Sequence, residues 1–162
     1  MYSEKKTAAD TILPVLKDVT IFAGLSKEAI CSIYDSCDIV EACIGEVLLK
    51  EGAPATDIFI LLRGRVSMVL NTAGQSLEIG DFGPGNCIGE ASVIGIQNHS
   101  ASAVVMEDAT LLVLSRKLLM DLFQSDLNLF SLLILNIARE IARRLHHSDE
   151  ILLHYGQRMR QE

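Results

Sequence analysis

The sequence contains no tryptophan and few other aromatic residues, and its basic residues are outnumbered by acidic ones. Aromatic residues make up 5% of the 162 residues, so few side chains are available on which nucleic-acid bases could stack. The net charge is −7, and residues 1–138 carry 9 lysines and arginines against 17 acidic residues. An acidic body repels phosphate backbones, which argues against nonspecific binding of nucleic acid.

Long apolar runs are also missing. No stretch approaches the roughly 18 apolar residues of a membrane-spanning helix, and the most apolar run, at residues 132–135, ends at Asn136. Residues 1–10 are charged and contain no hydrophobic segment of a secretory signal. We therefore expect a cytoplasmic protein that makes no contact with a membrane.

The cysteines show no C-x-x-C spacing, which is typical of redox and zinc sites. They are Cys31, Cys37, Cys43 and Cys87. An iron–sulfur cluster would use all four as ligands, but Cys31 and Cys37 fall on largely different faces of an expected helix. Reduced thiols are the preferred interpretation, and we expect no metal and no cofactor.

Glycines and short apolar runs divide the chain into a β-rich middle and helical ends. Ten of the eleven glycines lie between Gly24 and Gly95, and glycine punctuates strands and turns. Apolar or β-branched runs recur between them and up to Ser115 at spacings of about 8–12 residues. The runs are 39–40, 47–49, 58–62, 66–70, 77–79, 103–106 and 111–114. This pattern predicts an antiparallel sandwich or barrel, hence a mainly β fold with flanking helices.

Three helices are predicted to begin after Ser26, Ser115 and Asp126, whose side chains are good N-caps. In the last helix, apolar residues recur at steps of three and four from Phe130 to Tyr155. Two interpretations stay open: the helix packs on its own barrel, or its distal part pairs with a second copy as a homodimer. About 28 helical residues reach roughly 40 Å, beyond a small β domain, and this favours pairing.

The length corresponds to about one domain with an appendage. We expect an N-terminal segment over residues 1–21, a β-roll over 22–125 and a long C-terminal helix over 126–162 for dimerisation and output. No helix-turn-helix domain fits after Tyr155, so we expect no direct DNA binding.

The most informative stretch is residues 83–102. Gly89 permits a tight turn, and we expect residues 90–94 to form one short helical turn whose first N–H groups point together, as in an anion site. His99, Ser100 and Ser102 follow as further donors, and the Glu90 carboxylate is suited to accept hydrogen bonds from sugar hydroxyls. A ligand with a phosphate and a ribose is the functional interpretation. The alternative is that Glu90 is only a partner of the helix dipole.

At this point the sequence resembles the cyclic nucleotide-binding domain family, from about Phe22 to Leu145. The matching pieces stand in the family's order. They are Phe22–Ser26, Gly45–Glu46, Glu51–Gly52, Asp57–Val66, Gly83–Asn86, Gly89–Glu90 and Leu112–Ser115. The resemblance implies an eight-stranded antiparallel jelly-roll β-roll with helices at both ends.

The resemblance also implies which residues bind the ligand. In this family a glutamate holds the ribose 2′-hydroxyl, and an arginine followed by small residues holds the cyclic phosphate. The matching positions here are Gly89, Glu90, Ala91, Ser92, His99, Ser100 and Ala101. His99 occupies the arginine position, and it offers one titrating donor where arginine offers a permanent charge and a planar fork. The base is expected to meet the last helix, where Asn136, Arg139 and Arg143 are the candidate contacts.

The sequence leaves three candidate functions to be weighed. The first is a stand-alone regulatory module that binds cyclic AMP or cyclic GMP and transmits binding through its last helix. The second is a degenerate domain that keeps the fold, binds no cyclic nucleotide and acts in dimerisation or protein interaction. The third is an enzyme or a metal or haem protein, which we do not expect because no set of nucleophile, base and orienting group can be assembled.

Overall fold

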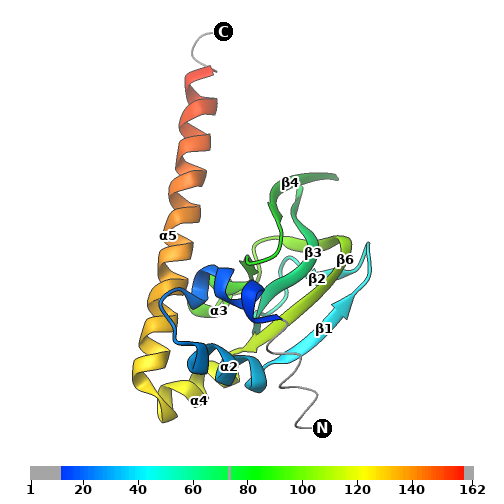
Figure 1. Ribbon diagram of the computed structural model, residues 1–162. Coiled ribbons are helices and arrows are strands. Elements are labelled where there is room, and N and C mark those ends of the chain that lie inside the picture. Colours follow the sequence, from blue (N-terminus) through cyan, green and yellow to red (C-terminus); the bar gives the residue numbers. More distant parts are fainter. Residues whose placement is uncertain (1–11, 73, 159–162) are drawn as a thin grey trace.

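The computed structural model describes residues 12–72 and 74–158, in which an antiparallel sheet is flanked by helices and a long last helix extends beyond it (Figure 1). Residues 12–18 are helical, and the short helix η1 (Thr20–Phe22) follows. The other helices are α2 (Lys27–Ser36), α3 (Glu90–Gly95), α4 (Arg116–Ser125) and α5 (Leu127–Arg158). The strands are β1 (Asp38–Ala42), β2 (Val47–Leu49), β3 (Asp57–Thr72), β4 (Gln75–Phe82), β5 (Cys87–Ile88) and β6 (Ser102–Ser115).

The six strands of the described residues form one sheet in which every pairing is antiparallel. The order is β1-β6-β3-β4, with β2 also pairing with β6 and β5 with β3. The long strands β3 and β6 run side by side and organise the rest. The mainly β, antiparallel prediction is confirmed.

The eight strands that the resemblance implies are not found, because the described residues form six. Four of the seven predicted runs belong to only two strands, and β5 was not among the predicted runs. The runs 58–62 and 66–70 both lie in β3, and the runs 103–106 and 111–114 both lie in β6. Gly64 interrupts β3 as a bulge: its φ is 86°, and a Cβ there would lie 2.5 Å from the backbone oxygen of Asp108. Glycine therefore bends the strand without ending it. The jelly-roll arrangement stays a prediction.

Alternate residues of the long strands are buried on opposite faces of the sheet. Ile58, Ile60 and Leu114 belong to the core that packs beneath the helices. Leu61 and Leu111 belong to a second core on the other face. The period of two in a strand thus places one apolar set against the helices and the other inside the curl of the sheet.

The three predicted N-caps are confirmed. The Ser26 hydroxyl accepts from the amide of Ala29 at 3.1 Å, and the Ser115 hydroxyl accepts from the amide of Leu118 at 3.1 Å. The Asp126 carboxylate accepts from the amide of Leu129 at 2.9 Å, so α5 begins where its sequence predicts. Each cap satisfies an amide that the helix itself leaves unpaired.

The two halves of α5 have different surroundings. Leu133 and Ile137 are fully buried in the helix-side core, so the proximal half packs on its own domain. The distal half extends past the sheet (Figure 1), and Leu145 and Leu152 are 63% and 68% exposed. The packing interpretation is therefore confirmed for the proximal half, and pairing of the distal half with a second copy stays a prediction.

Among the described residues, no helix is long and apolar enough to span a membrane.

Candidate functional site

A cavity of about 450 Å³ lies between the curled sheet, α3 and the middle of α5. The structure brings all seven residues of the predicted binding segment to its wall. They are Gly89, Glu90, Ala91, Ser92, His99, Ser100 and Ala101. Apolar side chains from the strands, including Met68, Ile79 and Phe82, form much of the remaining wall. Their contact with a ligand stays a prediction.

The local fold at Gly89 explains how α3 reaches the cavity. Gly89 adopts a φ of 87°, and a Cβ on it would lie 2.9 Å from the backbone oxygen of Asp57. Only glycine tolerates that conformation at that distance. The turn lets α3 begin at Glu90, as the sequence predicts, and the Gly89 carbonyl accepts from the amide of Val93 at 3.0 Å.

Glu90 is a buried carboxylate, with 3% of its surface exposed. Its Oε1 accepts from Nη1 of Arg144 at 2.6 Å, across 54 residues of sequence. Burial raises the pKa of Glu90, Arg144 and a hydrogen bond from the backbone amide of Glu90 oppose that shift, and Glu140 adds to it. An ionised glutamate at this position therefore depends on its arginine partner.

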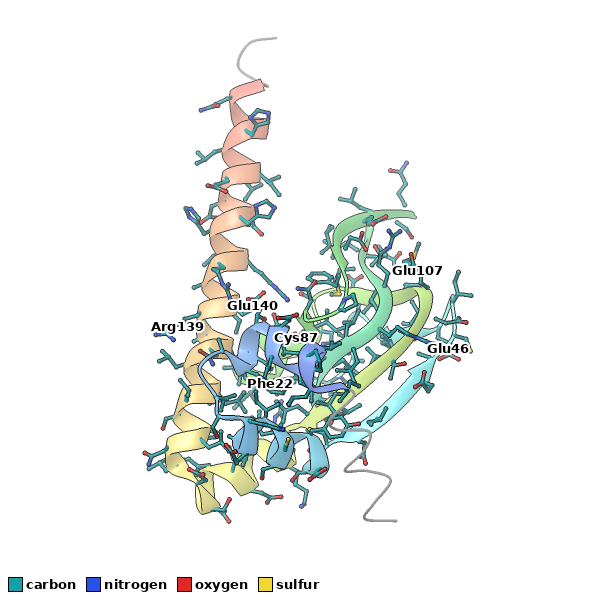
Figure 2. The ribbon with its side chains drawn as sticks, in the orientation of Figure 1. Phe22, Glu46, Cys87, Glu107, Arg139 and Glu140 are labelled. Carbon is teal, nitrogen blue, oxygen red and sulfur yellow. The ribbon has the colours of Figure 1, made fainter. Side chains whose placement is uncertain are left out.

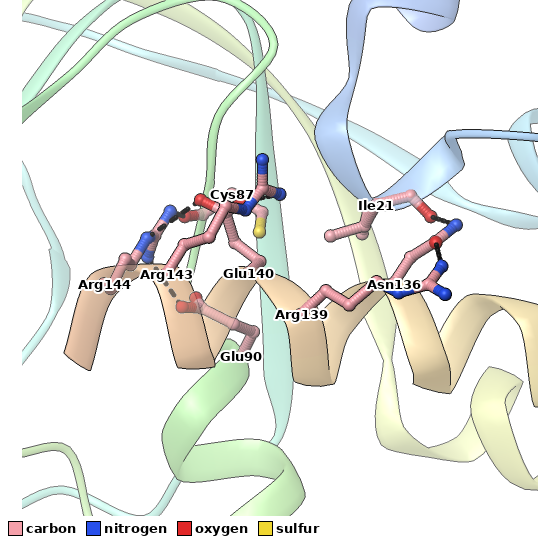
Figure 3. A network of polar contacts seen from close by, with 8 residues as sticks. All are labelled: Ile21, Cys87, Glu90, Asn136, Arg139, Glu140, Arg143 and Arg144. Carbon is pink, nitrogen blue, oxygen red and sulfur yellow. Dashed lines mark hydrogen bonds and ion pairs between the residues drawn. The ribbon is translucent and has the colours of Figure 1, made fainter. Parts of the chain in front are cut away.

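All three guanidinium nitrogens of Arg144 donate hydrogen bonds (Figure 3). Its Nη2 donates to the carbonyl of Cys87 at 2.6 Å, and its Nε donates to Oε1 of Glu140 at 3.1 Å. The guanidinium carbon also lies 4.7 Å from the centre of the Phe82 ring, as in a cation–π contact. This one side chain therefore joins α5 to β4, β5 and α3.

His99 lies on the same cavity and is 7% exposed. Its backbone holds the neighbouring turn: its carbonyl accepts from the amide of Gly52 at 2.8 Å, and its amide donates to the carbonyl of Ala53 at 2.9 Å. Burial lowers the pKa of the imidazole below the ordinary value of 6.5. The ring is therefore neutral at neutral pH, and Glu90 and Arg144 are the charged groups among the described lining residues.

The predicted base contacts do not reach the cavity. Asn136 is buried against η1, where its Nδ2 donates to the carbonyls of Ile21 at 3.1 Å and Ala23 at 2.7 Å. Arg139 points away from the sheet (Figure 2) and donates to the side chain of Asn136. Arg143 is exposed and pairs with Glu140.

A different face of α5 lines the cavity, formed by Ile141, Arg144, Leu145 and Ser148. These positions are three and four residues apart, so they share one side of the helix. The sequence analysis missed Arg144, because the periodicity of α5 does not show which of several neighbouring arginines faces the sheet.

Two of the free cysteines, Cys37 and Cys87, are buried. Burial raises the pKa of the Cys87 thiol, and it raises that of Cys37 to about 12, so both stay protonated at neutral pH. Within residues 12–72 and 74–158, no three histidine, cysteine or acidic side chains are placed to hold a metal ion.

The chain is similar in sequence to known proteins of one domain family. Residues 39–126, more than half of the chain, match the family described as "Cyclic nucleotide-binding domain". The cyclic AMP receptor protein of Thermus thermophilus is 30% identical over 106 residues, which are 65% of this chain and 47% of that protein. The human cGMP-dependent protein kinase 2 is 27% identical over 105 residues, 63% of this chain and 14% of the kinase. The chain thus spans less than half the length of these relatives.

A solved structure agrees over most of the chain. A cyclic nucleotide-binding domain from Methylobacillus flagellatus superimposes with a TM-score of 0.78 at 25% identity, and the match covers 91% of this chain and 83% of that one.

Proposed function

The chain belongs to the cyclic nucleotide-binding domain family, and from that premise we propose that it is a regulatory module that binds cyclic AMP or cyclic GMP and transmits binding through α5. The observation that carries the proposal is the shared cavity. Glu90, His99 and Ser100 line one space of about 450 Å³, within the roughly 300–1,000 Å³ of small-molecule sites.

In this proposal the ribose binds at Glu90. A carboxylate has two oxygens and about four acceptor positions. Oε1 of Glu90 accepts from Arg144, which leaves Oε2 to accept from a ribose hydroxyl. Because Glu90 is buried, such a hydrogen bond would form out of reach of competing water.

The cyclic phosphate is proposed to lie against His99 and Ser100. A neutral imidazole gives one N–H donor, and the Ser100 hydroxyl gives another. This pair binds an anion less tightly than an arginine fork, so we expect weaker binding than an arginine at position 99 would give.

The base is proposed to face the α5 residues that line the cavity. Leu145 offers apolar contact, and the Ser148 hydroxyl offers a polar one. Both purine bases are compatible with these groups, so the proposal covers cyclic AMP and cyclic GMP alike.

The output is proposed to run through the distal half of α5. Leu145, Leu152 and Leu153 are exposed on a helix that extends beyond its own domain. A second copy of the same helix would bury them, which supports a homodimer as the form in which binding is transmitted. Ile137 is fully buried within its own domain, so the proposed contact begins beyond it.

A second candidate function is a dimerisation or protein-interaction module that binds no nucleotide. The specific observation that favours it is the charge of the cavity. Glu90 and Arg144 are paired with each other, and burial lowers the pKa of His99 and keeps it neutral, so an entering phosphate meets no unpaired cation among the described lining residues.

Calorimetric titration of the native chain with cyclic AMP and with cyclic GMP separates the two candidates. We expect saturable binding of at least one, and about ten- to a hundredfold weaker binding by Glu90→Gln, because a hydrogen bond to a charged acceptor is lost. Glu46→Gln is the matched control, since Glu46 is exposed at the sheet edge far from α5 (Figure 2). If folded native protein binds neither nucleotide at millimolar concentration, the regulatory proposal fails and the interaction module replaces it.

A further inference from the structure

The charges of the cavity are balanced within the protein. Glu90 and Arg144 are the charged residues of the described wall, and they bond to each other at 2.6 Å. Arg144 also donates to Glu140 and to the carbonyl of Cys87, so each of its three guanidinium nitrogens already has a protein acceptor (Figure 3). The arginine therefore faces two carboxylates, and its charge is compensated before any ligand enters.

His99 adds no charge to the cavity at neutral pH. It has 7% of its surface exposed, and burial lowers the pKa of its imidazole. Among the described residues of the wall, from the sheet, α3 and α5, the charged groups that accompany it are Glu90 and Arg144, and neither is a cause of that shift. A phosphate at His99 would exchange its water for neutral donors alone, which is costly for an anion.

Much of the remaining wall is apolar. It includes Leu49, Met68, Ile79 and Phe82 from the sheet and Ile141 and Leu145 from α5. Such a wall suits a flat aromatic base and the carbon atoms of a sugar, because their transfer out of water is favourable. It contributes nothing to the binding of an anion.

The polar groups of the binding segment match hydroxyl groups better than phosphate oxygens. A neutral imidazole has one N–H donor and one acceptor nitrogen, and the Ser100 hydroxyl both donates and accepts. A 5′-hydroxyl also does both, so it can pair with either nitrogen of His99, whereas the oxygens of a cyclic phosphate only accept.

The carboxylate of Glu90 also favours a ligand with more hydroxyls. Its Oε1 accepts from Arg144, and a carboxylate has about four acceptor positions in all. The ribose of a nucleoside can donate to it from the 2′- and the 3′-hydroxyl. In a 3′,5′-cyclic phosphate the 3′-oxygen is esterified, and only the 2′-hydroxyl can donate.

We propose that the cavity also binds an uncharged purine nucleoside, with the ribose hydroxyls at Glu90 and the 5′-hydroxyl at His99 and Ser100. This inference rests on the proposed function for the positions of the ribose and the base, and it goes beyond it because the ligand lacks the phosphate. The phosphate contributes little to affinity at neutral pH in this cavity, so nucleoside and cyclic nucleotide compete for one site.

The test is calorimetric titration of the native chain at about pH 8 with adenosine, guanosine, cyclic AMP and cyclic GMP. A hydrogen bond between a phosphate and a charged donor contributes about tenfold or more to affinity. We therefore expect at least one nucleoside to bind with a dissociation constant less than about tenfold above that of its own cyclic monophosphate. Nucleosides that all bind more weakly than this, or that do not bind at millimolar concentration, overturn the proposal.

Two variants locate the nucleoside within the cavity. Glu90→Gln should weaken nucleoside binding by about tenfold or more, and the exposed Glu46→Gln is the control that should not. His99→Arg should raise the ratio of the nucleoside constant to the cyclic nucleotide constant by about tenfold or more, because only the phosphate gains from the arginine fork. Unchanged nucleoside binding by Glu90→Gln, or an unchanged ratio in His99→Arg, overturns the proposal.

The pH dependence of the same ratio gives a readout on the native chain. As the pH falls through the pKa of His99, the imidazolium attracts the phosphate, whereas an uncharged nucleoside gains no such attraction. The ratio of the nucleoside constant to the cyclic nucleotide constant should therefore rise toward acid pH. Titration of Glu90 cancels in the ratio, because both ligands use its carboxylate. A ratio that stays constant overturns the placement of the 5′ group at His99.

The four titrations also separate the failure of this inference from the failure of the proposed function. Binding of a cyclic nucleotide without comparable binding of either nucleoside leaves the proposed function standing and rejects the inference. Binding of a nucleoside alone supports the inference and rejects the cyclic nucleotide as the ligand. A folded native chain that binds none of the four compounds rejects both.

Discussion

His99→Arg is the change that most directly tests the phosphate half of the candidate site. His99 is 7% exposed and lines a cavity of about 450 Å³, so a longer side chain has space to extend toward a bound phosphate. Arginine stays charged at every working pH, and its fork can donate two hydrogen bonds to a phosphate. A hydrogen bond to a charged group contributes roughly 1.5–3 kcal/mol, so the variant should bind about ten- to a hundredfold tighter at pH 7.5.

Protonation of His99 should make the nucleotide affinity of the native chain depend on pH. Burial lowers the pKa of His99 in the ligand-free protein below 6.5, and a bound phosphate would raise it. Native affinity should therefore increase as the pH falls through the pKa of the complex, and the increase should be complete below the ligand-free pKa. The Arg variant should lack this dependence on His99, so its advantage shrinks toward acid pH.

Without ligand, the His99→Arg variant should be less stable than the native chain, although it is expected to bind nucleotide more tightly. An arginine at position 99 has no acid of its own in the cavity, since Glu90 is already paired with Arg144. The ligand-free variant should therefore unfold at a lower temperature than the native chain. Nucleotide at about 100 times its dissociation constant should then add about 2.7 kcal/mol of stability, which scanning fluorimetry detects as a rise in midpoint.

His99→Gln is the matched control, because it keeps a neutral donor and removes the titration. It should bind about as well as the native chain at pH 7.5 and should lose the gain at acid pH. The reasoning is refuted if the Arg variant binds no tighter than native at pH 7.5. It is equally refuted if the Gln variant keeps the native pH dependence.

Two further predictions concern stability and assembly. Asn136→Ala should lower the free energy of unfolding by about 2–4 kcal/mol, because it leaves the carbonyls of Ile21 and Ala23 without their donor. Chemical denaturation measures this difference. An equal loss of stability in the exposed Arg139→Ala variant would contradict the reasoning. Leu152→Glu should convert a dimer into monomers in light scattering with little change in melting temperature, because Leu152 is 68% exposed and contributes little to its own domain; a native chain that is monomeric at micromolar concentration would reject the dimer.

The strand pattern shows where local signals mislead. Arg63 and Gly64 separate the apolar runs 58–62 and 66–70, as a turn between two strands would. Sequence alone cannot distinguish such a turn from a bulge within one strand, which is what β3 contains here. The deciding contact is with the backbone of Asp108, on a strand 44 residues later. Because that contact depends on how β3 pairs with β6, only the assembled sheet fixes the number of strands.

Local sequence signals were enough to predict where the helices begin and which residues form the binding segment. Ser26, Ser115 and Asp126 cap their helices through hydrogen bonds to residues three positions later, so short-range chemistry was enough to predict them. The same holds for Gly89, whose turn starts α3 at Glu90. The binding segment is nearly continuous in sequence, which is why its members could be named before the fold was known.

Only the tertiary structure decided which face of α5 meets the cavity. Asn136, Arg139, Arg143 and Arg144 lie within nine positions of one helix, and all are polar. The helix rotation that buries Leu133 and Ile137 in the core directs Asn136 to η1 and Arg144 to Glu90. Since Glu90 and Arg144 are 54 residues apart, their pairing follows from the packing of α5 on the sheet and from no pattern within either segment.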